Sequence, residues 1–176
     1  MTIFKEGVVT AVLMSPNRGY PTHAQEEVEV EKFGIKGDRH SGPLRESFTR
    51  PGTMKPNDRP MLIIAAEEIM DMNNRFGLQM KPGSFNEQVD IDGMGDLRDL
   101  LPGDEFVFEG GVKLKFVESA TPCAELAAYH QEPRLLDKGV LVWKEGDNVI
   151  SRRGALTGVT REGVLRPGEK VVLQRV

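Results

Sequence analysis

Short apolar or alternating runs recur along this 176-residue chain, which contains 19 glycines and 11 prolines. Residues 7–14 and 61–65 are mostly apolar, as in buried strands, and residues 27–31 alternate between acidic residues and valine. The clearest hairpin spans residues 104–117, with two adjacent glycines at its turn. This pattern predicts a mainly-β protein, a closed or nearly closed β-barrel with a few short helices.

Two segments have helical character. Residues 67–76 place apolar side chains on one face and are followed by Gly77, a suitable C-cap, and residues 124–130 predict a shorter helix. Residues 135–144 fit a helix or a strand equally well. Further strands are expected at residues 85–91, 154–160 and 169–176. No repeat, low-complexity tract or linker interrupts this pattern, so one domain is expected over residues 1–176.

Composition argues against several classes of protein. The net charge of −4 disfavours general nucleic-acid binding, and no apolar run approaches the ~18–20 residues that cross a bilayer. The first residues lack the basic start and apolar stretch of a signal peptide. A single cysteine, Cys123, excludes an intramolecular disulfide framework. We therefore expect a cytoplasmic protein that binds neither nucleic acid nor a membrane.

Positive charge is concentrated in residues 36–60, which carry six Lys or Arg against three acidic residues. Glycines and prolines are frequent here and no periodicity lasts, so a long loop is predicted over residues 34–60. A basic segment in an acidic protein suggests a small anionic ligand. The alternative is a solvated loop whose charges bind nothing.

Cys123 lies between an alternating apolar stretch and the helical segment 124–130, and Pro122 precedes it. This order places the thiol at or near a helix N-terminus, where unpaired N–H groups and the helix dipole favour a thiolate. A thiolate is both a nucleophile and a ligand for soft metals. The alternative is that Cys123 is simply a small buried hydrophobic residue.

Cys123 is accompanied by other motifs. They are GIKGDRHSG at residues 34–42, KPGSFNEQV at 81–89, LLPGD at 100–104, TPC at 121–123, RGALTGV at 153–159 and GVLRPGEKV at 163–171. Their order and spacing resemble the MOSC domain family, which is named from the C-terminal part of molybdenum-cofactor sulfurases. The resemblance covers nearly the whole chain, about residues 7–176. It departs from the family pattern at Gln88, where the family has asparagine.

The resemblance implies the family's β-barrel fold and a functional role for Cys123, either as a thiolate ligand to molybdenum or as a carrier of persulfide sulfur. The cofactor implied is molybdenum cofactor, a pterin that carries a phosphate, whereas pyridoxal phosphate is not expected. The residues expected to bind the cofactor are Gly37, Asp38, Arg39, His40, Glu87 and Arg153.

Three functions follow from the resemblance. The first is a stand-alone MOSC protein that binds molybdenum cofactor through Cys123 and reduces N-oxygenated compounds with electrons from an external reductase. The second is a sulfur carrier in which Cys123 receives a persulfide from a cysteine desulfurase. The third is a binding module that stores or delivers the cofactor without catalysis.

Overall fold

The computed structural model describes residues 2–19, 21–47, 49–121, 123–136, 142–145, 148–151 and 153–175. Pro122, the proline expected to lead the chain into a helix, lies outside these residues. None of the described helices is long and apolar enough to cross a membrane.

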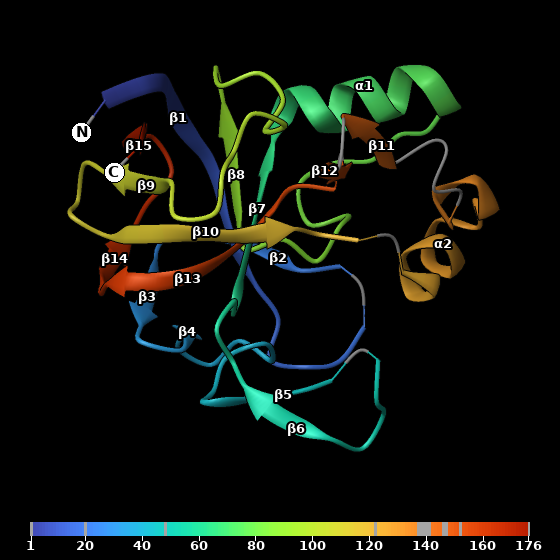
Figure 1. Ribbon diagram of the computed structural model, residues 1–176, viewed down its shortest axis with the longest axis horizontal. Coiled ribbons are helices and arrows are strands. Elements are labelled where there is room, and N and C mark those ends of the chain that lie inside the picture. Colours follow the sequence, from blue (N-terminus) through green and yellow to red (C-terminus); the bar gives the residue numbers. More distant parts are fainter. Residues whose placement is uncertain are drawn as a thin grey trace.

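Seven strands form a closed barrel (Figure 1). They are β1 (Thr2–Met14), β7 (Met61–Ala65), β8 (Val89–Asp92), β9 (Glu105–Phe108), β10 (Lys113–Ser119), β13 (Ala155–Arg161) and β15 (Lys170–Arg175). Their order is β15-β9-β10-β13-β7-β8-β1, and antiparallel pairing of β1 with β15 closes the ring. Only β7 and β8 run parallel among these pairs, and β2 (His23–Gln25) pairs with the end of β1. The predicted mainly-β barrel is confirmed.

The predicted hairpin corresponds to β9 and β10. Leu114 and Phe116 are buried and Lys115 between them is exposed, as the alternation of the sequence predicts. Gly111 adopts a φ of +97° in the turn, and its N–H donates to the Phe108 carbonyl at 2.8 Å. Glycine adopts this conformation without the steric cost that a side chain would bring.

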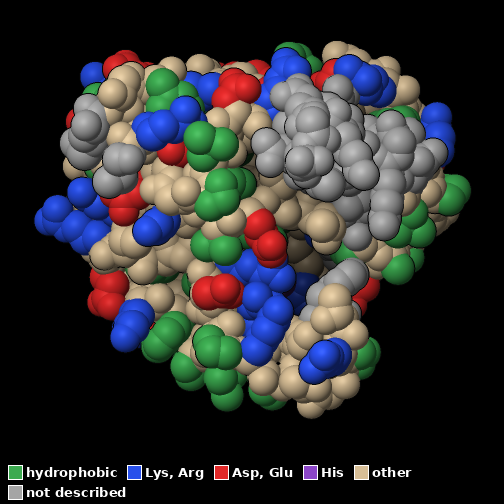
Figure 2. All heavy atoms as spheres, viewed as in Figure 1, with side chains coloured by type: hydrophobic (Ala, Val, Ile, Leu, Met, Phe, Trp, Pro, Cys, Tyr) green, Lys and Arg blue, Asp and Glu red, His purple; other side chains and the backbone are tan. Residues whose placement is uncertain are grey.

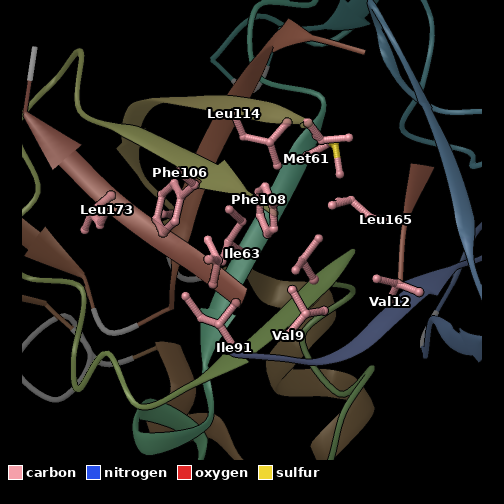
Figure 3. Packing of buried hydrophobic residues seen from close by; sticks show 14 of the residues in the cluster. Val9, Val12, Met61, Ile63, Ile91, Phe106, Phe108, Leu114, Leu165 and Leu173 are labelled. Carbon is pink, nitrogen blue, oxygen red and sulfur yellow. The ribbon is translucent and has the colours of Figure 1, made fainter. Parts of the chain in front are cut away.

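Two apolar cores lie on opposite faces of β7, all five residues of which are buried. Met61 and Ile63 point into the barrel, where buried side chains from all seven strands pack together (Figure 3). Leu62 and Ile64 belong to a second cluster beneath the helices. Burial on both faces explains why this strand is a continuous apolar run, and each such side chain contributes about 1.5–3 kcal/mol when fully buried.

Two α-helices flank the barrel in the described part of the chain. Helix α1 (Ala66–Phe76) ends at Gly77, a left-handed C-cap with a φ of +65°, as predicted. Helix α2 (Ala124–His130) begins directly after Cys123, which occupies the N-cap position. A 3₁₀ turn, η1 (Pro133–Leu136), follows α2. The two helices lie on the same side of the barrel in Figure 1.

The prediction of an unbroken loop over residues 34–60 was wrong. This segment contains β4 (Gly34–Ile35) and a hairpin of β5 (Leu44–Glu46) and β6 (Met54–Pro56), which stands apart from the barrel in Figure 1. Strands of two or three residues are too short to leave a period in the sequence. The short β4 joins β3 (Val28–Glu31) and β14 (Gly163–Leu165) in a separate sheet.

The predicted strand over residues 85–91 was too long, because β8 begins only at Val89 and residues 83–88 form a turn. Asn86 adopts a φ of +63° there, which a strand does not allow. The segment 135–144, which fitted a helix or a strand equally well, contains both. Its first two residues lie in η1 and its last three in β11 (Val142–Glu145), which pairs with β12 (Asn148–Ser151). Residues 137–141 lie outside the described residues.

Candidate functional site

Three segments carry the predicted site residues, and each adjoins the end of a strand. We call residues 37–42, which follow β4, the basic loop, and residues 83–88, which precede β8, the central turn. Cys123 lies between β10 and α2.

The basic loop is built around Asp38, which is buried. Its carboxylate accepts hydrogen bonds from the backbone N–H of Ser15 at 3.0 Å and of His40 at 2.8 Å, and the His40 Nδ1 lies 2.9 Å away. Burial alone would raise the pKa of Asp38, but the hydrogen bonds of His40 and Ser15 outweigh it and hold that pKa below its usual range. Asp38 is therefore a charged anchor that fixes the loop to the end of β1.

Gly37 starts this loop with a φ of +81°, and a methyl group placed there would lie 3.5 Å from the Met14 Cε. Gly37 therefore has room beside its backbone, while its contact with a ligand stays a prediction.

The central turn is organised by Glu87, whose side chain is fully buried. The Glu87 carboxylate accepts hydrogen bonds from the backbone N–H of Gly83 at 2.5 Å and of Phe85 at 2.8 Å. Gly83 has a φ of +92° and lies against the carbonyl of Thr22, so no side chain fits at this position. These contacts assign Glu87 a role in shaping the turn, while direct contact with a cofactor stays a prediction.

The basic loop and the central turn touch through two pairs of side chains. When the Asn86 amide takes the orientation that satisfies its neighbours, its oxygen accepts from the Arg39 guanidinium. The Gln88 Nε2 lies 3.2 Å from the His40 Nδ1. Gln88 is fixed in turn, since its Oε1 accepts from the Leu62 N–H at 2.8 Å. Gln88, the residue at which the sequence departs from the MOSC pattern, thus ties the turn to both the loop and the barrel.

The segment around Cys123 joins the central turn from the other side. The Cys123 side chain is half-buried and packs against the second core, to which Phe85 of the turn also belongs. The His130 Nε2, at the end of α2, lies 3.0 Å from the Ser84 carbonyl oxygen. Near the start of α2, Arg153 donates to the Thr121 carbonyl at 2.5 Å. The central turn therefore contacts both the basic loop and the cysteine-bearing helix.

A cluster of charges near the β5–β6 hairpin was not singled out from the sequence. Arg45 lies 2.9 Å from the Asp58 carboxylate, and Arg59 pairs with Glu118 at the end of β10. Burial and the nearby Arg45 lower the pKa of Arg59. Figure 2 shows Lys and Arg side chains gathered beside a hollow on the face between β10 and this hairpin. The excess of cations in residues 36–60 was the only signal for this cluster.

A groove of about 730 Å³ lies beside the sheet of β3, β4 and β14. Its lining includes Gly34 of β4 and Ser41 and Gly42 at the end of the basic loop, together with the acidic residues Glu29, Glu31 and Glu162. Cys123, Arg39 and His40 do not line it. Lys36 is one of the six cations of residues 36–60. Its ammonium group pairs with Glu29 at 2.7 Å beside this groove.

Comparisons with solved structures identify the fold. The YuaD protein from Bacillus subtilis has a TM-score of 0.80 and 20% sequence identity, with 96% of this chain and 95% of that chain covered. The YiiM protein from Geobacillus stearothermophilus has a TM-score of 0.67 and 21% identity, with 97% of this chain and 75% of that chain covered. YiiM from Escherichia coli has a TM-score of 0.65 and 16% identity, with 97% and 71% covered.

No curated protein sequence matches the chain. The family model of the MOSC domain, in contrast, matches residues 36–172, a range that contains the basic loop, the central turn, Cys123 and Arg153. The barrel, the order of the motifs and this match agree, and the chain belongs to the MOSC domain family.

Proposed function

We propose that this MOSC protein binds molybdenum cofactor through the thiolate of Cys123 and reduces N-oxygenated compounds with electrons from an external reductase. One observation supports it above the others: the central turn contacts both the loop that carries Arg39 and the helix that begins at Cys123. The segment with a soft metal ligand and the loop with a cation for a phosphate thus both contact the central turn.

The residues present fit such a cofactor. Cys123 is half-buried at the start of α2, so its sulfur combines partial shelter from water with access. The Nε of Arg39 is buried and has no hydrogen-bond partner among the described residues, although its guanidinium also contacts Asn86. A buried donor of this kind is costly unless an acceptor meets it, and a phosphate oxygen is a suitable acceptor.

Each residue has a proposed role. Cys123 would be the protein's ligand to the metal, while Arg39, His40 and Arg153 would hold the pterin phosphate or orient the substrate. Asp38 would keep His40 and the loop in place through the hydrogen bonds described above. The bound cofactor would supply a metal centre that takes an oxygen atom from the substrate. The reductase and the anionic cofactor are the partners proposed for this protein.

The test is an assay of purified protein from a molybdenum-replete host. We expect bound molybdenum and pterin in comparable molar amounts, and reduction of an N-hydroxylated test compound once an electron-transfer protein and its reductase are added. Cofactor without turnover would support the storage module instead. Cyanide-releasable sulfur on Cys123 without metal would support the sulfur carrier, and either result would overturn the proposed activity.

We expect the substitution Arg39→Ala to weaken anion binding far more than Lys55→Ala, which removes a cation from β6 in the same basic segment. A guanidinium–phosphate contact is typically worth about 1.5–3 kcal/mol, or roughly tenfold to a hundredfold in affinity. Lys55 is half-buried on β6 and lies outside the proposed site, so its removal should cost less than about 1 kcal/mol. Titration of both variants with inorganic pyrophosphate measures the difference. Equal small losses would mean that the cations of this segment are only solvated.

A further inference from the structure

Two buried carboxyl groups, one in the central turn and one near the start of β8, act on each other. Glu87 is 0% exposed and Asp90, on β8, is 1% exposed. Neither oxygen of the Asp90 carboxyl has a hydrogen-bond donor among the described residues, and the side chain with which it interacts is Glu87. Glu87, by contrast, already accepts two backbone N–H groups of the central turn.

Among the described residues, the strands on either side of Asp90 offer no compensating charge. Val89 and Ile91 point into the barrel, so Asp90 lies on its outer face, where its register partners are Ala11 of β1 and Ile64 of β7. Neither partner is charged, and Glu87 is the charged group that acts on Asp90. Two ionised carboxylates in contact would repel each other in a medium of low dielectric constant, and neither could donate a hydrogen bond.

We propose that Glu87 and Asp90 share one proton, which Asp90 donates to Glu87, and that this proton holds the central turn in the shape that presents Asn86 to Arg39 and Gln88 to His40. The backbone N–H groups of Gly83 and Phe85 favour the negative charge on Glu87, which leaves the proton on Asp90. Asp90 is thus a positioning residue that acts on the site through Glu87.

The proton matters because the turn is not a regular element. Asn86 is held at a φ of +63°, a conformation uncommon outside glycine, and it carries the contact with Arg39. If Asp90 lost its proton, Glu87 would face a second negative charge at the centre of the turn. The expected consequence is an altered turn, and with it a displaced Asn86 and Gln88, whatever ligand the site binds.

The electrostatics of the pair agree with a retained proton. Burial first, and then the charge of Glu87, raise the pKa of Asp90 to about 9. Burial also raises the pKa of Glu87, against the N–H groups that favour its charged form. The folded state therefore keeps a proton that an ordinary aspartate loses near pH ~4. The stability that this group contributes is fully present below pH ~4, where Asp90 is protonated in both the folded and the unfolded chain. Between pH ~4 and about 9 the equilibrium constant for folding falls about tenfold per pH unit.

Nuclear magnetic resonance of the unliganded protein tests the proposal. In the wild type, the amide signals of Gly83 and Phe85 and the side-chain amides of Asn86 and Gln88 should titrate together, with a midpoint in the alkaline range. Asp90→Asn supplies a permanent N–H donor to Glu87, so these signals should stay near their neutral-pH positions across the whole range. Asp90→Ala should displace them already at neutral pH.

The matched control is Glu68→Gln. Glu68 is another buried acid, whose pKa burial raises to about 8, but its partners are the N–H groups of Ala65 and Leu97. Each of Glu68→Gln and Asp90→Asn should reduce the slope of the unfolding free energy against pH by the amount that one proton contributes. Only Asp90→Asn should abolish the titration of the central turn. The same titration in Asp90→Asn as in the wild type would overturn the proposal.

Infrared spectroscopy of the unmodified chain gives a result even if a variant fails to fold. With ¹³C-labelled aspartate, the folded protein at neutral pH should show the carbonyl band of a protonated aspartic acid, and that band should disappear as the pH rises past about 9. A neutral-pH spectrum without any protonated aspartate would overturn the shared proton directly.

Discussion

Cys123→Ser is expected to reduce bound molybdenum, and the activity that depends on it, by at least ~100-fold while the fold is nearly unchanged. Serine nearly matches cysteine in shape, but its hydroxyl is a poor ligand for a soft metal and cannot carry a persulfide. Because Cys123 is only half-buried, the loss in free energy of unfolding should stay below about 1 kcal/mol. Metal content, activity and thermal melting are measured on both proteins.

Ala124→Ser is the matched control, since Ala124 is the exposed neighbour of Cys123 in the first turn of the same helix. It introduces the same hydroxyl and keeps the thiol, so metal content should remain at the wild-type level. If Cys123→Ser were as active as wild type, the thiol would have no part in the mechanism. A large loss of stability with partial activity would instead identify Cys123 as a residue of the second core.

Gly83→Ala is expected to destabilise the protein by about 2–4 kcal/mol and to disrupt the central turn. Gly83 has a φ of +92°, and an added Cβ would collide with the Thr22 carbonyl oxygen. The collision is hard to relieve, because Thr22 is held twice: its N–H donates to the Gly83 carbonyl at 3.3 Å and its hydroxyl to the Glu87 carbonyl at 2.8 Å. Urea unfolding measures the loss.

Gly168→Ala separates the two sources of this cost. Gly168 has nearly the same φ, +89°, but among the described residues no heavy atom beyond its chain neighbours lies within 4 Å of the position that a Cβ would take. Gly168→Ala should therefore lower the free energy of unfolding only by the penalty of placing alanine at a positive φ, about 1–2 kcal/mol. If Gly83→Ala were no more damaging than Gly168→Ala, the close approach of the turn to Thr22 would not contribute to stability.

The barrel and the helix starts could be predicted because their signals are local. The run at residues 61–65 and the alternation at 112–117 each follow from how a strand buries its faces, and Gly77 marks a helix end by its own conformational freedom. The position of Cys123 before α2 followed in the same way from the change of pattern on either side of it.

The turn and the charge pairs could not be predicted, because they depend on partners that are distant in the sequence. Asn86 and Gln88 look like part of a strand until their contacts with Arg39 and His40 are known. The burial of Asp90 depends on the neighbouring strands β1 and β7, which are distant from it in the sequence. No local pattern distinguishes Asp90 from Asp92, which alternates with the same apolar residues in β8 but is exposed.

The most direct test of the account is a crystal structure of the protein purified anaerobically with its cofactor, in which anomalous scattering locates molybdenum. We expect a metal bound by the Cys123 sulfur and a cofactor phosphate held by Arg39, with the central turn between them. Molybdenum bound away from Cys123, or a cofactor phosphate bound on the face opposite the basic loop, would contradict it.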